Sequence, residues 1–279
     1  MAIGSVRLQP GRGALSCAAL AIVLLAAGGQ EPYGLPLKGA EAESFLRTAD
    51  VVRRKGLPVG ITRSYQLTLS DGARTHKAAW KVIDEYKPGV TRFQEGGFEV
   101  DFRDSFKYEI AAYELDKLLG LDLVPPTVER VIEGERGSLQ IWVEGCMTEA
   151  DRKKRKLEVP DVEPWNAQMY DVRLLHQLTY NSDHANIRNI LIDPEFRVYA
   201  IDFSRSFRTH RELMGEKDLA RFSRATLERL RSLDKALLTE KLGRWLRDPE
   251  IDALLARRDV ILALVQRRIA EQGEARVLY

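Results

Sequence analysis

The spacing of apolar residues divides the chain into a strand-rich first half and a helical second half. Residues 63–69 (RSYQLTL) alternate between polar and apolar side chains, which is the pattern of a half-buried strand. The Asp-Gly turn at 70–73 then predicts a hairpin with a partner strand over 75–83. A second strand pair is predicted over 127–132 and 138–143, around a glycine-containing turn.

One helix is predicted within the strand-rich half. Residues 104–119 (DSFKYEIAAYELDKLL) carry apolar side chains at helical spacing, with Asp104 or Ser105 as the N-cap. Gly120 follows as a C-terminal stop, because glycine readily adopts the left-handed conformation that ends many helices. This unit is expected to end at the proline pair 125–126.

The second half of the chain is predicted to be mainly helical. Residues 165–180 (WNAQMYDVRLLHQLTY) have apolar positions at helical spacing, and short strands follow over 190–193 and 198–201. The stretch 211–279 predicts three or four amphipathic helices, the longest over about 249–272. The order of elements predicts an α+β fold in which a small strand-rich lobe with one helix precedes a larger, mostly helical lobe.

The first 29 residues have the layout of a secretory signal peptide. Arg7 and Arg12 form a basic start, residues 14–27 are an apolar run, and two glycines follow. This run is short for a membrane span, which needs about 20 residues. We therefore expect export to the periplasm or the extracellular space, or anchoring to a membrane by residues 14–27. Membrane contact is expected at most through this N-terminus.

The rest of the chain divides into a linker and two lobes. Residues 30–45 contain glycine and proline and predict a linker, while 46–144 predict the small lobe and 145–279 the large lobe. Within the large lobe, 151–156 (DRKKRK) predict a solvated loop, because acidic residues flank the basic ones. The alternative for this run is contact with phosphate or nucleic acid.

Composition limits the classes of protein that the chain can form. Of its 279 residues, 44% are hydrophobic and 30% are charged, which suits a sizeable core and excludes a disordered chain. Two cysteines, Cys17 and Cys146, are too few for a disulfide scaffold or a structural zinc site. The 43 basic residues exceed the 41 acidic ones by Arg7 and Arg12, so the remainder is balanced. Because nonspecific nucleic-acid binding requires a basic field, we do not expect it.

The segment 181–202 carries the residues with the clearest chemistry. A polar loop holds Asp183, Asn186 and Asn189, and Asp202 ends a short strand soon after it. Phosphoryl transfer uses such a set. One carboxylate orients the attacking hydroxyl and accepts its proton, while an amide oxygen and a second carboxylate hold Mg²⁺. The alternative is that these side chains only cap turns, but their combination in one segment favours phosphoryl transfer.

A nucleotide-binding pair is predicted in the small lobe. In protein kinases a strand lysine paired with a helix glutamate positions the α- and β-phosphates. Lys81 lies in the apolar part of its strand and Glu109 among apolar residues of the helix, whereas Glu114 and Asp116 are expected to face water. Lys81 and Glu109 are therefore the candidate pair.

A phosphate-binding loop is expected before these strands. The segment 56–64 (GLPVGITRS) holds two glycines and small hydroxyls, so the backbone around Gly60 and Thr62 is the candidate. An ordinary turn would have the same composition.

The order of these residues resembles an atypical kinase fold. This fold is shared by phosphatidylinositol 3-/4-kinases, HipA-type kinases and the secretory-pathway kinases that include the Golgi casein kinase. Residues 108–128 (YEIAAYELDKLLGLDLVPPTV) are similar to the helix and VPPTV stretch of the secretory group, and residues 180–207 resemble the catalytic and metal loops of the wider family. The similarity covers roughly residues 50–210.

The resemblance implies a role for each residue of the polar segment. ATP and Mg²⁺ or Mn²⁺ would bind between the lobes, with Asp183 as the catalytic base and with Asn189 and Asp202 as metal ligands. Asp183 and Asn189 are six positions apart, where the usual spacing is five. Either the loop holds one extra residue, or Asn186 binds the metal instead.

The same resemblance gives expectations for further residues. Lys81 and Glu109 would form the nucleotide pair, and the hinge that ends at Glu144 would offer backbone groups to adenine. Arg205 and Arg208, which follow the metal-binding segment, would either bind phosphate or brace the loop.

The function expected is ATP- and metal-dependent transfer of a phosphoryl group to a hydroxyl of a protein, a sugar or a lipid headgroup. Two alternatives stay open. One is a pseudokinase that acts as a binding module, because the catalytic loop is irregular and Ser204 stands where the family has the glycine of D-F-G. The other is nucleotidyl transfer to a protein on the same fold.

Overall fold

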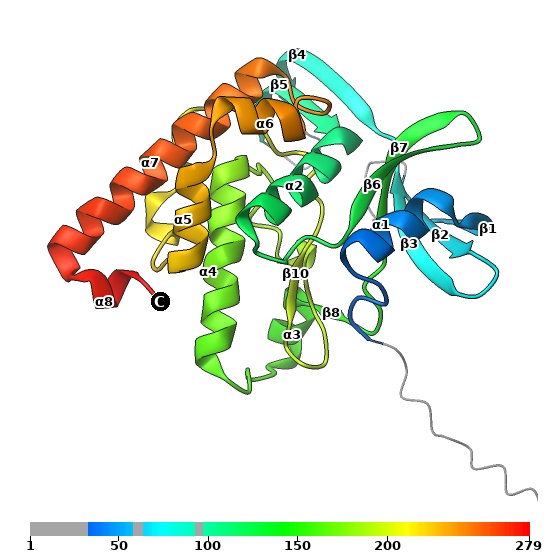
Figure 1. Cartoon of the computed structure of the whole chain (residues 1–279), viewed down its shortest axis with the longest axis horizontal. Coiled ribbons are helices and arrows are strands. Elements are labelled where there is room, and N and C mark those ends of the chain that lie inside the picture. The colour runs from blue at the N-terminus through cyan, green and yellow to red at the C-terminus, as the bar shows by residue number, and fades with distance from the viewer. Residues whose placement is uncertain (1–32, 58–63, 93–96) are drawn as a thin grey trace, which may run out of the picture. The chain divides into compact units, whose positions relative to one another are not determined.

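A computed structural model of the chain describes residues 33–57, 64–92 and 97–279. The predicted leader, and the predicted phosphate loop with Gly60 and Thr62, lie outside the described residues. A sheet-rich N-terminal lobe is followed by a helical C-terminal lobe (Figure 1). This arrangement confirms the predicted α+β fold with two lobes.

Five antiparallel strands form the main sheet of the N-terminal lobe, in the order β1-β2-β3-β7-β6. The strands are β1 (Asp50–Gly56), β2 (Ser64–Ser70), β3 (Thr75–Lys81), β6 (Thr127–Ile132) and β7 (Glu135–Ile141). All except β1 match predicted strands. Strand β1 was missed because it is an edge strand whose side chains are nearly all exposed, so its sequence (DVVRRKG) does not alternate.

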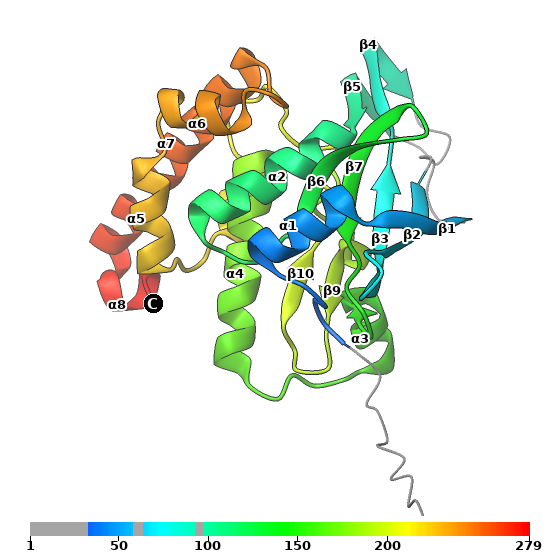
Figure 2. The ribbon, with the colours of Figure 1, turned by 45° about the vertical axis from the view of Figure 1, so that its right-hand side comes forward.

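Helix α1 (Gly39–Thr48) corrects the predicted linker over 30–45. Ala42, Phe45 and Leu46 share one face of this helix and are buried in the core of the N-terminal lobe. Figure 2 shows α1 lying across the sheet beside β6. The linker prediction was wrong from Gly39 onward because this apolar face is short and is interrupted by charged residues.

Helix α2 (Phe106–Leu119) lies between the main sheet and the helices of the C-terminal lobe (Figure 1). Its N-cap is Ser105, whose hydroxyl accepts a backbone N–H of the first turn, and it ends at Gly120 with a φ of 60°. Asp116 is buried and does not face water as predicted, because its carboxylate accepts the backbone N–H of Leu123 at 3.1 Å. Packing on both sides therefore fixes the position of Glu109 on this helix.

Strands β4 (Asp84–Arg92) and β5 (Phe98–Ser105) form a separate two-stranded sheet that was not predicted. In Figures 1 and 2 this pair extends beyond the main sheet. Strand β5 runs directly into α2, so residues near its end lie close to the candidate site.

The C-terminal lobe contains a small antiparallel sheet beside its helices. Strands β8 (Met147–Thr148), β9 (Ile190–Ile192) and β10 (Val198–Ala200) pair in the order β10-β9-β8. Helix α4 (Val162–Thr179) leads to the polar loop, and the 3₁₀ turn η1 (Ile187–Asn189) leads from it into β9. Helix α3 (Glu149–Arg155) occupies most of the run 151–156 that was predicted as a loop, and a Thr148–Asp151 capping box begins it.

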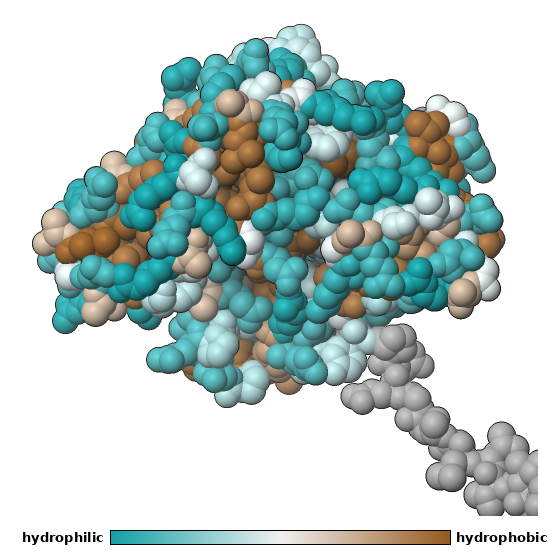
Figure 3. Space-filling view, viewed as in Figure 1, coloured by the Kyte–Doolittle hydropathy of each residue, from teal (hydrophilic) through white to brown (hydrophobic). Residues whose placement is uncertain are grey.

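Helices complete the C-terminal lobe after β10. The elements are η2 (Glu216–Asp218), α5 (Arg224–Ser232), α6 (Lys235–Leu242), α7 (Asp248–Gln272) and α8 (Glu274–Val277). Apolar side chains of α2, α4 and α7 share one core. Within the part of the chain that the structure describes, no helix has the length and apolar character needed to cross a membrane. The face shown in Figure 3 is mostly hydrophilic, with separate hydrophobic patches.

Candidate active site

Three charged side chains from both lobes meet at the end of β3. The Lys81 Nζ lies 2.5 Å from Glu109 Oε1 on α2 and 2.7 Å from Asp202 Oδ1, just after β10. The side chains of Lys81 and Glu109 are 18% and 3% exposed, whereas that of Asp202 is 41% exposed. The predicted pairing of Lys81 with Glu109 is present, and Asp202 extends it to a triad with one accessible carboxylate.

Burial and opposite charge compete within this triad. Burial lowers the pKa of Lys81, but the charges of Asp202 and Glu109 outweigh it and hold the pKa above its ordinary value. Burial also acts to raise the pKa of Asp202, and the charge and hydrogen bond of Lys81 reverse this, so the pKa is lowered. For Glu109 burial prevails over Lys81, and its pKa is raised. The accessible carboxylate is therefore the one whose pKa lies below its ordinary value.

The backbone after β10 directs Asp202 toward Lys81. Asp202 has a φ of 64°, in the left-handed region that residues other than glycine rarely adopt. The backbone N–H of Phe203 donates to Glu109 Oε2 at 3.0 Å, and Ser204 Oγ donates to Asp202 Oδ1 at 3.2 Å. One oxygen of Glu109 holds Lys81 and the other holds this backbone, so α2 positions both partners.

The polar loop after α4 surrounds Asp183 with amides. Asp183 Oδ2 accepts hydrogen bonds from Asn186 Nδ2 at 3.0 Å and Asn189 Nδ2 at 2.9 Å. The Asn186 amide oxygen accepts the backbone N–H of Arg188 and caps η1. The Asn189 amide oxygen has no hydrogen-bond partner among the described residues. This geometry favours Asn189 over Asn186 as a metal ligand, and the assignment stays a prediction.

Two buried residues next to the site were missed as site residues. Asn181 is fully buried, and its Oδ1 accepts the backbone N–H of Asp183 at 3.0 Å while its Nδ2 faces the Asp202 carbonyl at 3.5 Å. Asp104 is 5% exposed, burial raises its pKa, and its Oδ1 has no hydrogen-bond partner among the described residues. The Asn-Ser-Asp triplet at 181–183 could have indicated Asn181 as a site residue. No local sequence pattern marks Asp104 as buried.

The hinge does not present Glu144 as predicted. Its backbone N–H donates to the Gly34 carbonyl at 2.9 Å, and its carbonyl accepts the Gly34 N–H at 2.8 Å. Its carboxylate accepts from Lys77 Nζ at 2.9 Å. The backbone N–H and carbonyl of Glu144 are therefore paired within the protein, because the segment before α1 runs along this part of the hinge.

Comparison with known proteins identifies the fold. No family model and no curated protein matches the chain. A structure of hydra Fam20 with sugar aligns with a TM-score of 0.61 and 15% identity, over 86% of this chain and 91% of that one. The Golgi casein kinase aligns with a TM-score of 0.61 and 14% identity, over 87% of this chain and 78% of that one. The Helicobacter pylori proinflammatory kinase CtkA aligns with a TM-score of 0.48 and 10% identity, over 82% of this chain and 99% of that one. The chain has an atypical protein-kinase-like fold.

The kinase-like fold accounts for the position of the triad. Kinases bring a strand lysine, a helix glutamate and a metal-binding aspartate together where nucleotide phosphates bind. Here β3, α2 and the segment after β10 supply Lys81, Glu109 and Asp202. No group of three or more His, Cys, Asp or Glu within the described ranges could hold a metal by itself. The Asp202 carboxylate and the Asn189 amide oxygen fit Mg²⁺ or Mn²⁺, since Mg²⁺ usually takes one or two carboxylates together with substrate phosphates.

Glu99 of β5 connects the small lobe of the kinase fold with the segment after Asp202. Its Oε2 accepts from Arg205 Nη2 at 2.5 Å, and its Oε1 pairs with Arg208. The Arg205 carbonyl in turn accepts the backbone N–H of Ser182 at 3.2 Å. Of the two predicted roles for these arginines, the contacts favour bracing the loops over binding phosphate.

His176 of α4 packs against the same segment. Its ring stacks on Phe203, with centroids 5.4 Å apart and 14° between the planes. Burial, with a smaller contribution from His184, lowers the pKa of His176 to about 3. The folded protein therefore holds this imidazole neutral at pH 7.

We expect His176 to make the fold sensitive to acid. Its ordinary pKa is 6.5, so the unfolded chain takes up the proton first as the pH falls. The stability it contributes is full above pH 6.5 and is lost as the pH falls toward 3. Between about pH 7 and pH 4.5 the wild type should lose about 2–3 kcal/mol more unfolding free energy than His176→Phe. Urea unfolding at both pH values checks this, and equal losses would contradict it.

Proposed function

We propose that the protein is an ATP- and divalent-metal-dependent phosphotransferase that acts on a hydroxyl group. The observation that carries this proposal is the contact of Lys81 with both Glu109 and Asp202. It joins a phosphate-binding cation and a metal-binding carboxylate at one point. Asn181 bonds to the backbone of both Asp183 and Asp202, so the proposed base belongs to the same site. The left-handed backbone of Asp202 supports a functional role, since such conformations gather at active sites.

In the proposed reaction Asp183 accepts the proton of the attacking hydroxyl. A bond forms between the hydroxyl oxygen and the γ-phosphorus of ATP while the bond from that phosphorus to the bridging oxygen breaks. The products are a phosphate ester and ADP. Asn186 and Asn189 hold Asp183 Oδ2, so Oδ1 would be the oxygen that takes this proton. Lys81, held by Glu109, would orient the α- and β-phosphates.

Asn189 and Asp202 would hold the divalent metal. When bound, the ion offsets negative charge on the phosphates. Lys81 lowers the pKa of Asp202, so this carboxylate is ionised and ready for a cation at neutral pH. Glu109 fixes the backbone of Phe203 and thereby the direction of Asp202.

Intact-mass spectrometry of the protein after incubation with ATP and Mg²⁺ or Mn²⁺ tests the proposal, together with measurement of ATP consumption. We expect metal-dependent phosphate adducts or ADP release, both lost in Asp183→Ala. Adducts with the mass of AMP would instead support nucleotidyl transfer. A metal-dependent thermal shift with ATP, without adducts or ADP, would support a pseudokinase and overturn the phosphotransferase. The hydra Fam20 structure contains sugar, which supports including sugars among the acceptors tested beside proteins and lipid headgroups.

We also infer that the protein is exported. The basic start, apolar run and small residues of 1–29 support this. Sequencing the N-terminus of protein from the periplasm or the culture fluid should find a chain that begins near residue 30. Recovery only with an intact N-terminus in the membrane fraction would support the anchor instead.

A further inference from the structure

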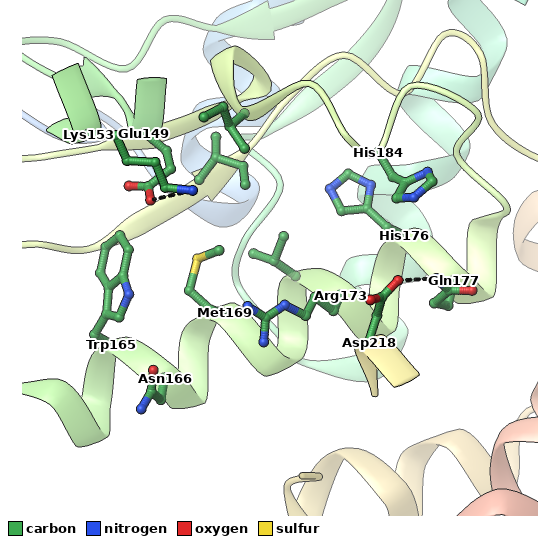
Figure 4. Close-up of a pocket in the computed structure, with 13 residues that line it drawn as sticks. Glu149, Lys153, Trp165, Asn166, Met169, Arg173, His176, Gln177, His184 and Asp218 are labelled. Carbon is green, nitrogen blue, oxygen red and sulfur yellow. Dashed lines mark hydrogen bonds and ion pairs between the residues drawn. The ribbon is translucent and has the colours of Figure 1, made fainter. Parts of the chain in front are cut away.

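A cavity of about 360 Å³ lies beside the polar loop, and none of its lining residues belongs to the Lys81 triad. Figure 4 shows it between α3, α4 and the loop that carries His184. Turn η2 contributes Asp218 to another wall. The volume is in the lower range of small-molecule sites, which span about 300–1,000 Å³.

His176 gives this cavity an unsatisfied polar group. The side chain lines the cavity and is 5% exposed, yet its Nδ1 has no hydrogen-bond partner within the described residues. Buried polar atoms are normally hydrogen-bonded, because removal from water without a partner is costly. A neutral imidazole offers one donor and one acceptor. A polar group inside the cavity would therefore complete the bonding of His176.

If Arg152 is counted, which pairs with Glu149 from outside the lining, three basic side chains face two acidic ones, Glu149 and Asp218. Lys153 and Arg173 lie on different sides of the cavity (Figure 4). Glu149 is committed to Arg152, which donates two hydrogen bonds to it at 2.6 and 2.9 Å, while Lys153 stays 3.7 Å away. No ion pair of Arg173 is found among the described residues. Asp218, the remaining acid, contacts Gln177 at 3.5 Å.

Part of the lining is apolar and would pack against the carbon atoms of a ligand. Met169 from α4 and the pair Ile187 and Ile190 beyond the loop supply this part of the wall. Trp165 extends it, and its ring is fixed by Phe196 in an edge contact with centroids 6.3 Å apart. A bare inorganic anion would leave this wall without contacts.

We propose that the cavity binds a small organic phosphate, with its phosphate held by Lys153 and Arg173 and a hydroxyl group hydrogen-bonded to His176. Two cations on facing walls suit a phosphate, which accepts charge-assisted hydrogen bonds on several oxygens. A neutral sugar would leave Arg173 without an ion pair in the described part of the chain, and Lys153 with only its 3.7 Å contact to Glu149. The proposal concerns binding and does not depend on phosphotransferase activity.

Histidine-selective NMR provides a direct test. The chain has four histidines, of which His176 and His184 line the cavity, while His76 and His210 do not and serve as internal controls. Ribose 5-phosphate should shift the first two resonances in a saturable way, with a Kd of about 1 mM or lower. Ribose and inorganic phosphate should each bind at least about tenfold more weakly, since each makes only part of the contacts.

Variants of Lys153 and Arg173 distinguish binding in the cavity from nonspecific attraction of the phosphate to surface cations. Arg173→Gln and Lys153→Gln should each raise the Kd for ribose 5-phosphate about tenfold. Lys154→Gln is the matched control, because Lys154 is the next residue on α3, is exposed and does not line the cavity. It should change the Kd by less than about twofold. Unmoved His176 and His184 signals at about 10 mM ligand, or a Kd unchanged by both cation variants, would overturn the proposal.

Discussion

Replacing Asp202 with asparagine should reduce phosphoryl transfer by at least about a thousandfold. The substitution removes the ionised side chain that we propose as a metal ligand, and with it the charge that pairs with Lys81 at 2.7 Å. The backbone bond between Phe203 and Glu109 does not involve the Asp202 side chain, so the fold should persist. Steady-state ATP turnover and calorimetric titration with Mn²⁺ would measure both losses.

Asp252→Asn on α7 is a matched control for this variant. Asp252 is 46% exposed and pairs with Lys235 at 2.8 Å, much as Asp202 is 41% exposed and pairs with its own lysine. Its loss should change turnover by less than about twofold, because an exposed pair contributes little. Wild-type turnover and Mn²⁺ affinity in Asp202→Asn would rule out the metal-binding role.

Features of the site that depend on neighbouring residues could be predicted from the sequence. The apolar context of Lys81 and Glu109 marked both as inward-facing, and the two side chains meet. Ser105 and Gly120 marked the ends of α2 by their own conformational preferences. In each case the physical cause acts within a few residues of the chain.

Features made by distant segments could not be predicted. Gly34 pairs with the hinge at Glu144, although 110 positions separate them. Glu99 was assigned to no element, because its strand alternates weakly and its partners Arg205 and Arg208 come from the other lobe. Asp116 is buried only because the chain after α2 folds back over it. These polar residues carry no local sign of burial, since their charges are satisfied by tertiary contacts.

Helix α2 explains why the two lobes form one site. It packs against β6 and β7 on one side and against α5 and α6 on the other. Glu109 projects from it and contacts Lys81 of the small lobe and the Phe203 backbone of the large lobe. A shift of α2 would therefore separate Lys81 from the segment that carries Asp202.

Arg257→Met should have the largest effect on stability, about 3–5 kcal/mol. Arg257 on α7 is fully buried, and its guanidinium donates to the carbonyls of Leu178 at 2.8 Å, Arg208 at 2.9 Å and His210. Burial lowers its pKa to about 10, which still leaves it charged at pH 7. Methionine fills the space but leaves these carbonyls unpaired in the core. Urea unfolding would measure the loss of unfolding free energy.

A control variant on α7 and a conservative variant of Arg257 distinguish the loss of these hydrogen bonds from a general destabilisation of the helix. Arg267→Met removes an exposed arginine of the same helix that pairs with Glu216 at 2.6 Å, and it should cost less than about 1 kcal/mol. Arg257→Lys keeps the charge but lacks the planar fork that spans several carbonyls, so its loss should lie between the two. Leu178 precedes the polar loop and Arg208 follows the Asp202 segment, so Arg257 holds both ends of the site. If Arg257→Met were no less stable than Arg267→Met, the carbonyl bonds would contribute nothing to holding these loops together.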